Sequence, residues 1–433
     1  MKQELSRRFL LRLLSGIRHE RLEIVAGDKR YGFGDSAAAL RATVTMHDDG
    51  VWREVLRGST GLAETYMDGR WDVDDMVCLI RIAARNMGPL DRARDFWHPV
   101  LHPTQRLTRM IPTNDHAGSR ANISAHYDLG NKLFSLFLDP TLTYSAAYFE
   151  SPRVSLEEAQ RAKLERICTH LALGPDDHLL EIGTGWGSMA IHAATRYGCR
   201  VTTTTISQEQ HDVAVQRVRE AGVGHLVEVL LEDYRDLTGT YSKLVSIEMI
   251  EAVGWQYFDT YFRRCSELLE PDGLMLLQAI TADDRVYKTE KASKSFINTL
   301  IFPGGCLPSL EVIHDCLAGE TDMRTVWLDD ITHHYSETLR RWREDFVAHA
   351  AEADALGYDE RFRRMWLLYL AYVEAGFAER RIADVQMLLA KPEWRATLPD
   401  RESRVEQPSV MVPSATRSAA RLAAEHPAGD LVK

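Results

Sequence analysis

The feature that most constrains the fold is a glycine-rich turn that joins an apolar segment to a helix-like segment. Residues 179–188 read Leu-Leu-Glu-Ile-Gly-Thr-Gly-Trp-Gly-Ser. Glycine has no side chain, so such a turn lets the backbone approach a ligand closely at the carboxyl end of a buried strand. A strand, a glycine turn and a helix in this order therefore predict an α/β fold with a ligand site over Gly183 and Gly185.

Strand-like and helix-like segments alternate around this turn. The apolar segments expected as strands are residues 179–182, 201–204, 227–231, 244–247 and 274–279. Residues 207–221 have apolar side chains at helical spacing, and Gly222 is placed to end that helix. The alternation predicts a doubly wound, Rossmann-like parallel sheet.

The chain, at 433 residues, is too long for one ordinary domain. Residues 1–102 predict a small N-terminal α+β domain, with strand-like pieces at 21–25 and 42–46 and helix-like pieces at 61–67 and 74–84. Proline and polar residues mark residues 103–120 as a linker, and residues 121–395 form the predicted catalytic domain. Residues 396–433 are rich in serine, alanine, proline and charge, which is typical of a disordered tail.

Composition excludes several classes of protein. With 45% hydrophobic and 27% charged residues the chain is typical of soluble globular proteins, and no apolar run approaches the roughly 20 residues that span a bilayer. The net charge of −11 disfavours nonspecific nucleic-acid binding as the main role. The six cysteines are scattered without metal-ligand spacing, which favours a reducing cytoplasm and argues against a structural zinc.

The residues at the end of the second predicted strand indicate which of two classes of cofactor the chain binds. Residues 203–207 read Thr-Thr-Thr-Ile-Ser, without the carboxylate that a nicotinamide-dinucleotide site would place there. Glu181 followed by the glycine turn, and Glu-Asp-Tyr at 232–234, instead resemble segments that bind S-adenosylmethionine in class I methyltransferases. Ser207 and Gln210 also fit a capping box at a helix start, and the two roles are compatible.

Longer motifs extend the resemblance over nearly the whole chain, to about residue 393. They include Ser-Ala-His-Tyr-Asp-Leu-Gly-Asn at 124–131, Ile-Phe-Pro-Gly-Gly-Cys-Leu-Pro-Ser at 301–309 and Tyr-Ser-Glu-Thr-Leu-Arg-Arg-Trp at 335–342. Residues 61–69, 142–145, 205–210 and 249–254 match as well, and the order is the same. The sequence resembles the cyclopropane-fatty-acyl-phospholipid synthases, a family that also includes mycolic-acid cyclopropane synthases and fatty-acid C-methyltransferases.

The resemblance implies a set of residues that bind S-adenosylmethionine. These are Tyr144, Ser145, Gly183, Gly185, Thr205, Ile206, Ser207, Gln210, Asp233 and Tyr234. It also implies a bicarbonate ion beside the reacting carbon, at the positions Ala146, Glu251, Gln278, Ile280 and Tyr335. Ala146 stands where many members have cysteine, and Gln278 where many have histidine. A backbone N–H and a glutamine amide can still donate to an anion.

The implied reaction sets physical demands of its own. Methyl transfer to an alkene leaves a carbocation, so the pocket must exclude water. An aromatic face such as that of Tyr335 can stabilise the cation by ~0.5–2 kcal/mol. A base must then remove a proton, and Glu251 follows the fourth strand, where α/β folds present their chemistry. The alternative for Glu251, and the preferred interpretation of Glu248, is a solvated carboxylate at a helix start.

The resemblance implies a cyclopropane-fatty-acyl-phospholipid synthase that acts on unsaturated phospholipid acyl chains. A methylene or methyl-branched product is the close alternative, because the sequence does not fix which proton leaves. A noncatalytic lipid-binding protein is disfavoured by the retained Glu251 and Tyr335. A small-molecule N- or O-methyltransferase is disfavoured by the N-terminal domain and by residues 340–386, which are expected to be a long helical region.

The expected location is the cytoplasm, in peripheral contact with the inner face of the membrane. Residues 1–24 are expected to contain a short amphipathic helix. An acidic protein that acts on anionic lipid needs a local basic and apolar surface. Candidate contacts are Arg7, Arg8, Leu10, Leu11, Arg12 and Leu14, or the basic residues at 106–109. The sequence leaves a homodimer open.

Overall fold

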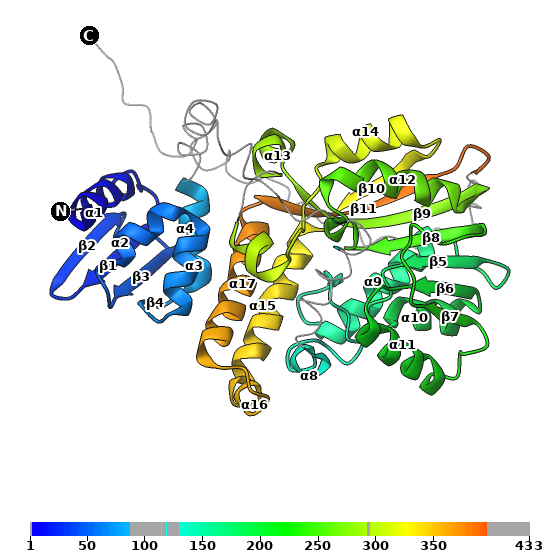
Figure 1. The fold of residues 1–433 in the computed structure, drawn as a ribbon, viewed down its shortest axis with the longest axis horizontal. Coiled ribbons are helices and arrows are strands. Elements are labelled where there is room, and N and C mark those ends of the chain that lie inside the picture. The colour runs from blue at the N-terminus through cyan, green and yellow to red at the C-terminus, as the bar shows by residue number, and fades with distance from the viewer. Residues whose placement is uncertain (1, 87–113, 115–117, 119–129, 292–294, 396–433) are drawn as a thin grey trace, which may run out of the picture. The chain divides into compact units, whose positions relative to one another are not determined.

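The computed structural model describes residues 2–86, 114, 118, 130–291 and 295–395 (Figure 1). The described residues up to Trp394 belong to one compact unit. The predicted tail, and the predicted linker apart from Asn114 and Gly118, lie outside the described residues. The predicted domain boundaries therefore stay a prediction. Within the described residues, no helix combines the length and the apolar character needed to cross a membrane.

A four-stranded sheet near the N-terminus has the strand order β2-β1-β3-β4. Its strands are β1 (Arg21–Ala26), β2 (Lys29–Gly34), β3 (Arg41–Met46) and β4 (Trp71–Val73). The accompanying helices are α1 (Lys2–Leu14), α2 (Val51–Glu54), α3 (Ser59–Met67) and α4 (Met76–Asn86), with a 3-10 turn at Val55–Arg57. Leu22 and Ile24 of β1 belong to one apolar core, because alternate strand positions face the same side. Val44 of β3 and Trp52 of α2 belong to the same core. The strands and helices predicted for this region are confirmed.

The larger sheet has seven strands in the order β10-β11-β9-β8-β5-β6-β7. They are β5 (His178–Ile182), β6 (Arg200–Thr204), β7 (Val227–Leu230), β8 (Tyr241–Ile247), β9 (Leu269–Ala282), β10 (Arg324–Asp330) and β11 (Ile382–Ala390). The strands from β5 to β9 pair in parallel, whereas β11 is antiparallel to both β9 and β10. The five predicted strands are confirmed.

The prediction of helix as far as residue 386 is wrong after Ala378, where α17 ends and β11 soon follows. From Asp384 onward the side chains of β11 are nearly all buried between two neighbouring strands and the flanking layers. A short apolar run of this kind does not distinguish a buried strand from a buried helix.

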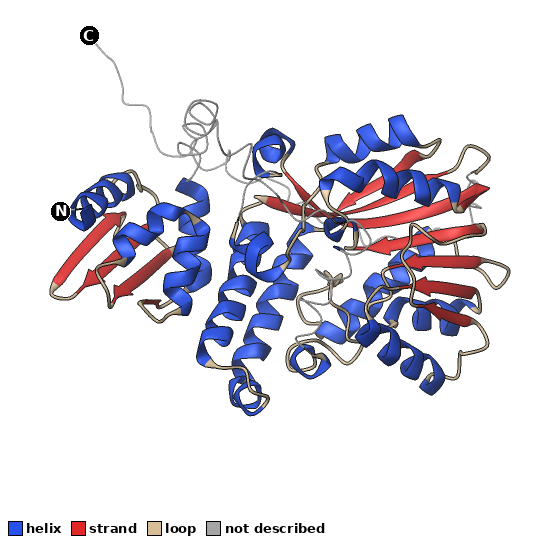
Figure 2. Ribbon diagram, in the orientation of Figure 1, coloured by secondary structure: helices blue, strands red, loops and turns tan. Residues whose placement is uncertain are grey.

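Helices cover both faces of the larger sheet (Figure 2). The helices of this part of the chain are α8 (Asn131–Phe134), α9 (Leu156–His170), α10 (Ser188–Tyr197), α11 (Gln208–Glu220), α12 (Phe258–Glu267), α13 (Asp284–Glu290), α14 (Leu310–Glu320), α15 (Thr332–Ala348), α16 (Ala350–Ala355) and α17 (Glu360–Ala378). Of these, α12 and α14 lie on one face of the sheet and α10 and α11 on the other (Figure 1 and Figure 2). Short turns lie at Ile250–Ala252, Trp255–Tyr257 and Ile297–Ile301. Successive residues of β5 enter different cores: Leu179 packs with α9 and α10, whereas Leu180 packs with α12 and α14.

The chain segments that border the ligand site follow local signals. Ser207 caps α11, since its Oγ accepts a hydrogen bond from the N–H of Gln210. Gly187 adopts a left-handed conformation, with φ 86°, immediately before α10 begins. The glycine turn is thereby held between the end of β5 and the start of α10, as the sequence predicts.

Candidate active site

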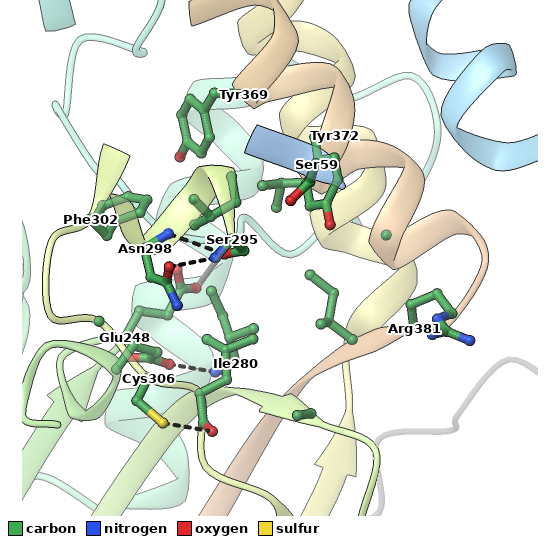
Figure 3. A pocket seen from close by; sticks show the side chains of 18 of the residues that line it. Ser59, Glu248, Ile280, Ser295, Asn298, Phe302, Cys306, Tyr369, Tyr372 and Arg381 are labelled. Carbon is green, nitrogen blue, oxygen red and sulfur yellow. Dashed lines mark hydrogen bonds between the residues drawn. The ribbon is translucent and has the colours of Figure 1, made fainter. Parts of the chain in front are cut away.

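A large cavity opens over the carboxyl ends of β5, β6 and β8. Its volume is about 1600 Å³, and it is lined at one end by the glycine turn and at the other by apolar side chains that include Leu14, Trp52 and Leu79. In Figure 3, Tyr369 and Tyr372 of α17 lie across the cavity from Glu248 and Ile280, which border the sheet. The position agrees with the rule that open α/β sheets bind ligands at their carboxyl edge.

The glycine turn leaves room for a ligand. Gly183 has φ 103°, and a Cβ built there would lie 3.2 Å from Cγ of Met249. Gly185 has φ 52°, and a Cβ there would meet no atom within 4 Å. The N–H groups of Gly183 and Thr184 donate to the carbonyl of Thr204, at 3.0 and 3.1 Å, and fix the turn to β6. The space beside Gly185 is the kind of cradle that a closely approaching cofactor requires.

Glu181 lies beneath this turn and is only 3% exposed. Its carboxylate accepts a hydrogen bond from Oγ1 of Thr203, at 2.7 Å. Burial raises the pKa of Glu181 to about 8, although the Thr203 hydrogen bond and the charge of Lys163 act in the opposite direction. Glu181 also lines the cavity, so it is placed to contact a ligand held by the turn.

The second predicted cofactor segment lies at the end of β6. Oγ1 of Thr205 donates to Oε1 of Gln210, at 2.9 Å, and both residues line the cavity with Ile206. Ser207 accepts the capping bond from the N–H of Gln210, at 3.3 Å, which confirms the predicted cap on that side. Ser207 is 4% exposed, and its side chain serves the helix start.

Asp233 and Tyr234 follow β7 and line the same part of the cavity. Asp233 forms an ion pair with Arg235, with 2.6 Å between Oδ2 and Nη2. Tyr234 packs edge-on against Tyr261, with 5.6 Å between ring centroids, and burial raises its pKa. Arg235 also lies over the ring of Tyr257. These two residues, both predicted to bind the cofactor, therefore line the same cavity as the turn, and Asp233 has a fixed orientation.

Tyr144 and Ser145 approach the cavity from the segment before α9. The hydroxyl groups of Tyr144 and Tyr369 are hydrogen bonded at 2.7 Å. Oγ of Ser145 accepts a hydrogen bond from Nζ of Lys163, at 2.7 Å. Lys163 is fully buried, and burial lowers its pKa to about 8 while nearby carboxylates, first Glu248, oppose that shift. Sequence reasoning did not identify Lys163, because it lies inside a helix with no motif around it.

The positions predicted to hold bicarbonate lie close together, but three of them donate hydrogen bonds to the carboxylate of Glu248. The N–H of Ala146 and Nε2 of Gln278 each donate to Oε1 of Glu248, both at 2.8 Å. The hydroxyl of Tyr335 donates to Oε2 of the same carboxylate, at 2.5 Å. Glu248 was interpreted from the sequence as a solvated helix-start carboxylate, whereas here it is held by these donors at the cavity wall.

Glu248 also has an unusual backbone. Its φ is 49°, in the left-handed region that residues other than glycine rarely adopt. Its N–H donates to the carbonyl of Gln278, at 2.8 Å. Burial raises the pKa of Glu248, while its hydrogen bonds with Tyr335, Ala146 and Gln278 and the charge of Lys163 lower it. Strained backbone of this kind persists where surrounding contacts fix it, and it is found most often at functional sites.

Glu251 and Ile280 form a separate pair beside Glu248. The N–H of Ile280 donates to Oε1 of Glu251, at 2.5 Å. Oε2 of Glu251 is buried without a hydrogen-bond partner among the described residues. Burial, and then the neighbouring charge of Glu248, raise the pKa of Glu251 to about 8. Two carboxyl groups therefore line this wall of the cavity, where the sequence predicted one.

A further buried carboxylate, Asp384 of β11, lies behind Gln278. Nε2 of Gln278 donates to Oδ2 of Asp384, at 3.1 Å, as well as to Glu248. Oε1 of Gln278 accepts from Nε2 of Gln386, at 3.0 Å, which fixes the orientation of the amide. Asp384 and Gln386 were missed because the strand that carries them was predicted as helix. Glu248 could have been found, since it directly follows a strand at the ligand-binding edge.

Comparisons with known proteins show which protein family this chain is similar to. The family described as mycolic acid cyclopropane synthetase matches residues 114–387. The tuberculostearic acid methyltransferase UfaA1 of Mycobacterium tuberculosis is 40% identical over 369 residues, which cover 83% of this chain and 85% of the relative. The cyclopropane-fatty-acyl-phospholipid synthase of Escherichia coli is 37% identical over 359 residues, which cover 81% and 88%.

A solved structure agrees with the fold. The mycolic acid cyclopropane synthase CmaA1, complexed with SAH and CTAB, aligns with a TM-score of 0.59 and 33% identity. The alignment covers 63% of this chain and 98% of that structure. The large sheet and its helices are therefore those of a class I methyltransferase.

Proposed function

The chain belongs to the mycolic acid cyclopropane synthetase family and is an S-adenosylmethionine-dependent methyltransferase that modifies lipids, and we propose that it acts on the double bond of unsaturated acyl chains in membrane phospholipids. The proposed product is a cyclopropane ring. The observation that carries the proposal is one continuous cavity that joins the glycine turn, two carboxyl groups and a long apolar wall.

The residues around the glycine turn fit the cofactor. Gly183 and Gly185 would lie against its methionine and ribose portions, with Gln210 on the ribose side and Asp233 and Tyr234 near the adenine. When bound, S-adenosylmethionine supplies an electrophilic methyl group. The open space beside Gly185 and the fixed orientations of Gln210 and Asp233 mean that little of the site must be reorganised on binding.

The rest of the cavity fits a long apolar substrate. A small-molecule site usually occupies about 300–1,000 Å³, and this cavity of about 1600 Å³ exceeds that range. Beyond Tyr144 and Tyr369 its wall continues through Leu62, Leu79 and Ile80, which have no group to bind a polar substrate. An acyl chain can fill such a space by burial of apolar surface alone, at roughly 25 cal/mol per Å².

The walls near Glu248 suit a cationic centre on carbon. Tyr144, Tyr335 and Tyr369 line the cavity there, and each aromatic face can stabilise a nearby cation by ~0.5–2 kcal/mol. Tyr335 is 6% exposed and stacks on Phe377, with 4.4 Å between ring centroids, so its ring has a fixed position. Exclusion of water by these rings protects the cation until a carboxylate removes a proton.

A methyl-branched or methylene product is the second candidate. It is favoured by the 40% identity with a protein named a tuberculostearic acid methyltransferase. Both products begin with the same methyl transfer. A hydride shift before the added methyl group loses its proton gives a methylene branch instead of a ring, and a saturated methyl branch needs in addition a separate reductant that supplies hydride. The residues that bind cofactor and chain are the same in either case.

We also propose peripheral membrane contact through α1, with different side chains from those the sequence suggested. Leu10, Leu11 and Leu14 pack into the small core. Leu5, Phe9 and Leu13 of the same helix are instead 61%, 57% and 37% exposed. Arg7 and Arg8 pair with Glu4, and Arg12 is exposed near the apolar residues. The other predicted contact, at 106–109, lies outside the described residues.

The test uses the purified chain with S-adenosylmethionine and vesicles of a phospholipid that carries one unsaturated acyl chain. Vesicles of the matched saturated phospholipid are the control. NMR of the extracted lipid separates ring protons from those of a methylene or methyl branch. We expect a ring product from the unsaturated lipid only. Equal modification of the saturated lipid, or methylation of a head group, would contradict the proposed site of reaction.

A further inference from the structure

Resting on the proposed function, we propose that the carboxylate of Glu248 is the proton acceptor, and that it replaces the bicarbonate ion that the family resemblance implies. Of the donors at the positions expected to bind that ion, those of Ala146, Gln278 and Tyr335 donate to Glu248 at 2.5–2.8 Å. The remaining one, the N–H of Ile280, donates to Glu251 at 2.5 Å. A bicarbonate ion would need the same three donors. The residues therefore do not fit the ion, and a side chain supplies its carboxylate instead.

The burial of the donors supports this replacement. Ala146 and Gln278 are fully buried, at 0% exposed, whereas Glu248 lines the cavity. A free anion could reach the N–H of Ala146 only after Glu248 moved away. A second anion placed in the cavity beside Glu248 and Glu251 would also meet two like charges whenever both carboxyl groups are ionised. The geometry thus disfavours both exchange of the ion and its simultaneous binding.

Different numbers of hydrogen bonds give the carboxyl groups of Glu248 and Glu251 different roles. Glu248 receives three hydrogen bonds from the N–H and O–H groups named above, which favour its ionised form. Glu251 receives one, from Ile280, and its second oxygen has no partner among the described residues. Lys163, Asp384 and Tyr335 are titratable groups that act on Glu248, and Tyr261 acts on Glu251. When the pair shares one proton, Glu251 is the member that holds it.

The proton-transfer step balances without another reactant. After the alkene π electrons have formed the bond to the incoming methyl carbon, the neighbouring carbon is cationic. A C–H bond of the added methyl group breaks, and its electron pair closes the ring on that carbon. The proton passes to an oxygen of Glu248, which becomes a neutral acid and later releases the proton to water. Gln278 acts as a positioning residue, because its amide holds Glu248 and is itself fixed by Asp384 and Gln386.

The backbone conformation at Glu248 allows a variant that removes the carboxylate without straining the chain. Because φ is 49°, glycine fits this position without strain, so Glu248→Gly removes the carboxylate and leaves its three donors in place. Ala172, with φ 51°, gives a matched control as Ala172→Gly, at a left-handed position far along the chain from the donors. Glu248→Gln keeps the size of the side chain and removes its charge.

The experiment measures three things in carbonate-free buffer and after addition of bicarbonate: lipid turnover, binding of S-adenosylhomocysteine by calorimetry, and binding of ¹³C-bicarbonate by NMR. We expect wild type to be active without bicarbonate and to bind none. Glu248→Gln should lose turnover by roughly 10²–10⁴-fold, since a general base is removed. Glu248→Gly should be as inactive in carbonate-free buffer, should bind the labelled ion, and should recover turnover when it is added. Ala172→Gly should behave as wild type.

Wild type that requires bicarbonate, or Glu248→Gln with nearly normal turnover, would overturn the inference. Glu248→Gly that binds S-adenosylhomocysteine normally but neither binds the ion nor recovers would also overturn it. Failure of the proposed function has a different signature, in which wild type modifies no acyl chain under either condition. In that case the binding of ¹³C-bicarbonate, measured by NMR, still decides whether Glu248 occupies the anion position. This measurement needs neither cofactor nor lipid.

Discussion

The two ends of the cavity are built in different ways. The cofactor end consists mainly of two successive strand–turn–helix units. Gly183 and Gly185 act through backbone geometry between β5 and α10, and Ser207 caps α11 after β6. The reaction end is assembled from Ala146, Glu248, Gln278, Tyr335 and Asp384, which come from five separate segments. Local sequence therefore determines the first end, whereas the second depends on how distant segments meet.

The largest effect is expected at the cofactor end, from Gly185→Ala. A methyl group there enters the open space beside the turn, so the affinity for S-adenosylmethionine should fall by about 100-fold or more, measured by calorimetry. Gly222→Ala is the matched control, because Gly222 has φ 73° and no atom within 4 Å of an added Cβ, yet lies outside the cavity lining. Equal affinity in the two variants would contradict the proposed cofactor position.

At the reaction end, Tyr335→Phe should lower turnover while cofactor affinity stays unchanged. The variant loses one hydrogen bond to a carboxylate, worth about 1.5–3 kcal/mol, which corresponds to roughly a 10- to 150-fold fall in rate. Tyr241→Phe, whose hydroxyl makes a bond of 3.5 Å to the carbonyl of Thr238, is the control. A loss of cofactor affinity in Tyr335→Phe would show that the two ends are not separable.

Most of the cofactor end was predictable, and the reason is that its residues act over short sequence distances. The glycine turn, the cap at Ser207 and the five strands follow from apolar periodicity and turn chemistry. Tyr335 and Gln278 are found by resemblance. The position of Glu248 directly after a strand marks it as a candidate, but its pairing with Tyr335 is not predictable, because a hydrogen bond over 87 positions leaves no local pattern. Asp384 was missed for a different reason: a short apolar run does not distinguish a buried strand such as β11 from a buried helix.

The pH dependence of stability should differ from that of most proteins with salt-bridged carboxylates. Burial raises the pKa of Glu181 to about 8 from an ordinary value of 4.5, so its contribution to stability is present below pH 4.5 and is lost as the pH rises toward 8. Glu181→Gln should therefore flatten the fall in the free energy of unfolding between these pH values, measured by urea titration. If the free energy of unfolding falls with pH equally steeply in the variant and the wild type, the raised pKa of Glu181 is contradicted.

The same reasoning applies at the reaction end to Glu251, whose pKa burial also raises to about 8. Glu251→Gln should flatten the curve over the same window and by a similar amount, since the pKa is raised to about 8 at both positions. A steeper curve in Glu251→Gln would show that Glu248, rather than Glu251, holds the shared proton.

The smallest effect is expected away from the reaction end, on membrane contact through α1. Replacement of Leu5, Phe9 and Leu13 by serine should weaken binding to anionic phospholipid vesicles by roughly 3- to 10-fold, because exposed apolar area is lost. The control replaces Val326 and Leu328 of β10, which are 43% and 40% exposed. Sedimentation with vesicles measures both, and equal losses in the two variants would exclude α1 as the specific contact.

The central claim is that this chain places a carbon from S-adenosylmethionine onto lipid acyl chains. It is tested most directly in a bacterial host that lacks such an enzyme, grown with methyl-¹³C methionine while it expresses the chain. We predict that mass spectrometry finds one labelled carbon in acyl chains that were unsaturated, and none in saturated chains or head groups. Folded, cofactor-binding protein in a host whose acyl chains carry no label would contradict the claim.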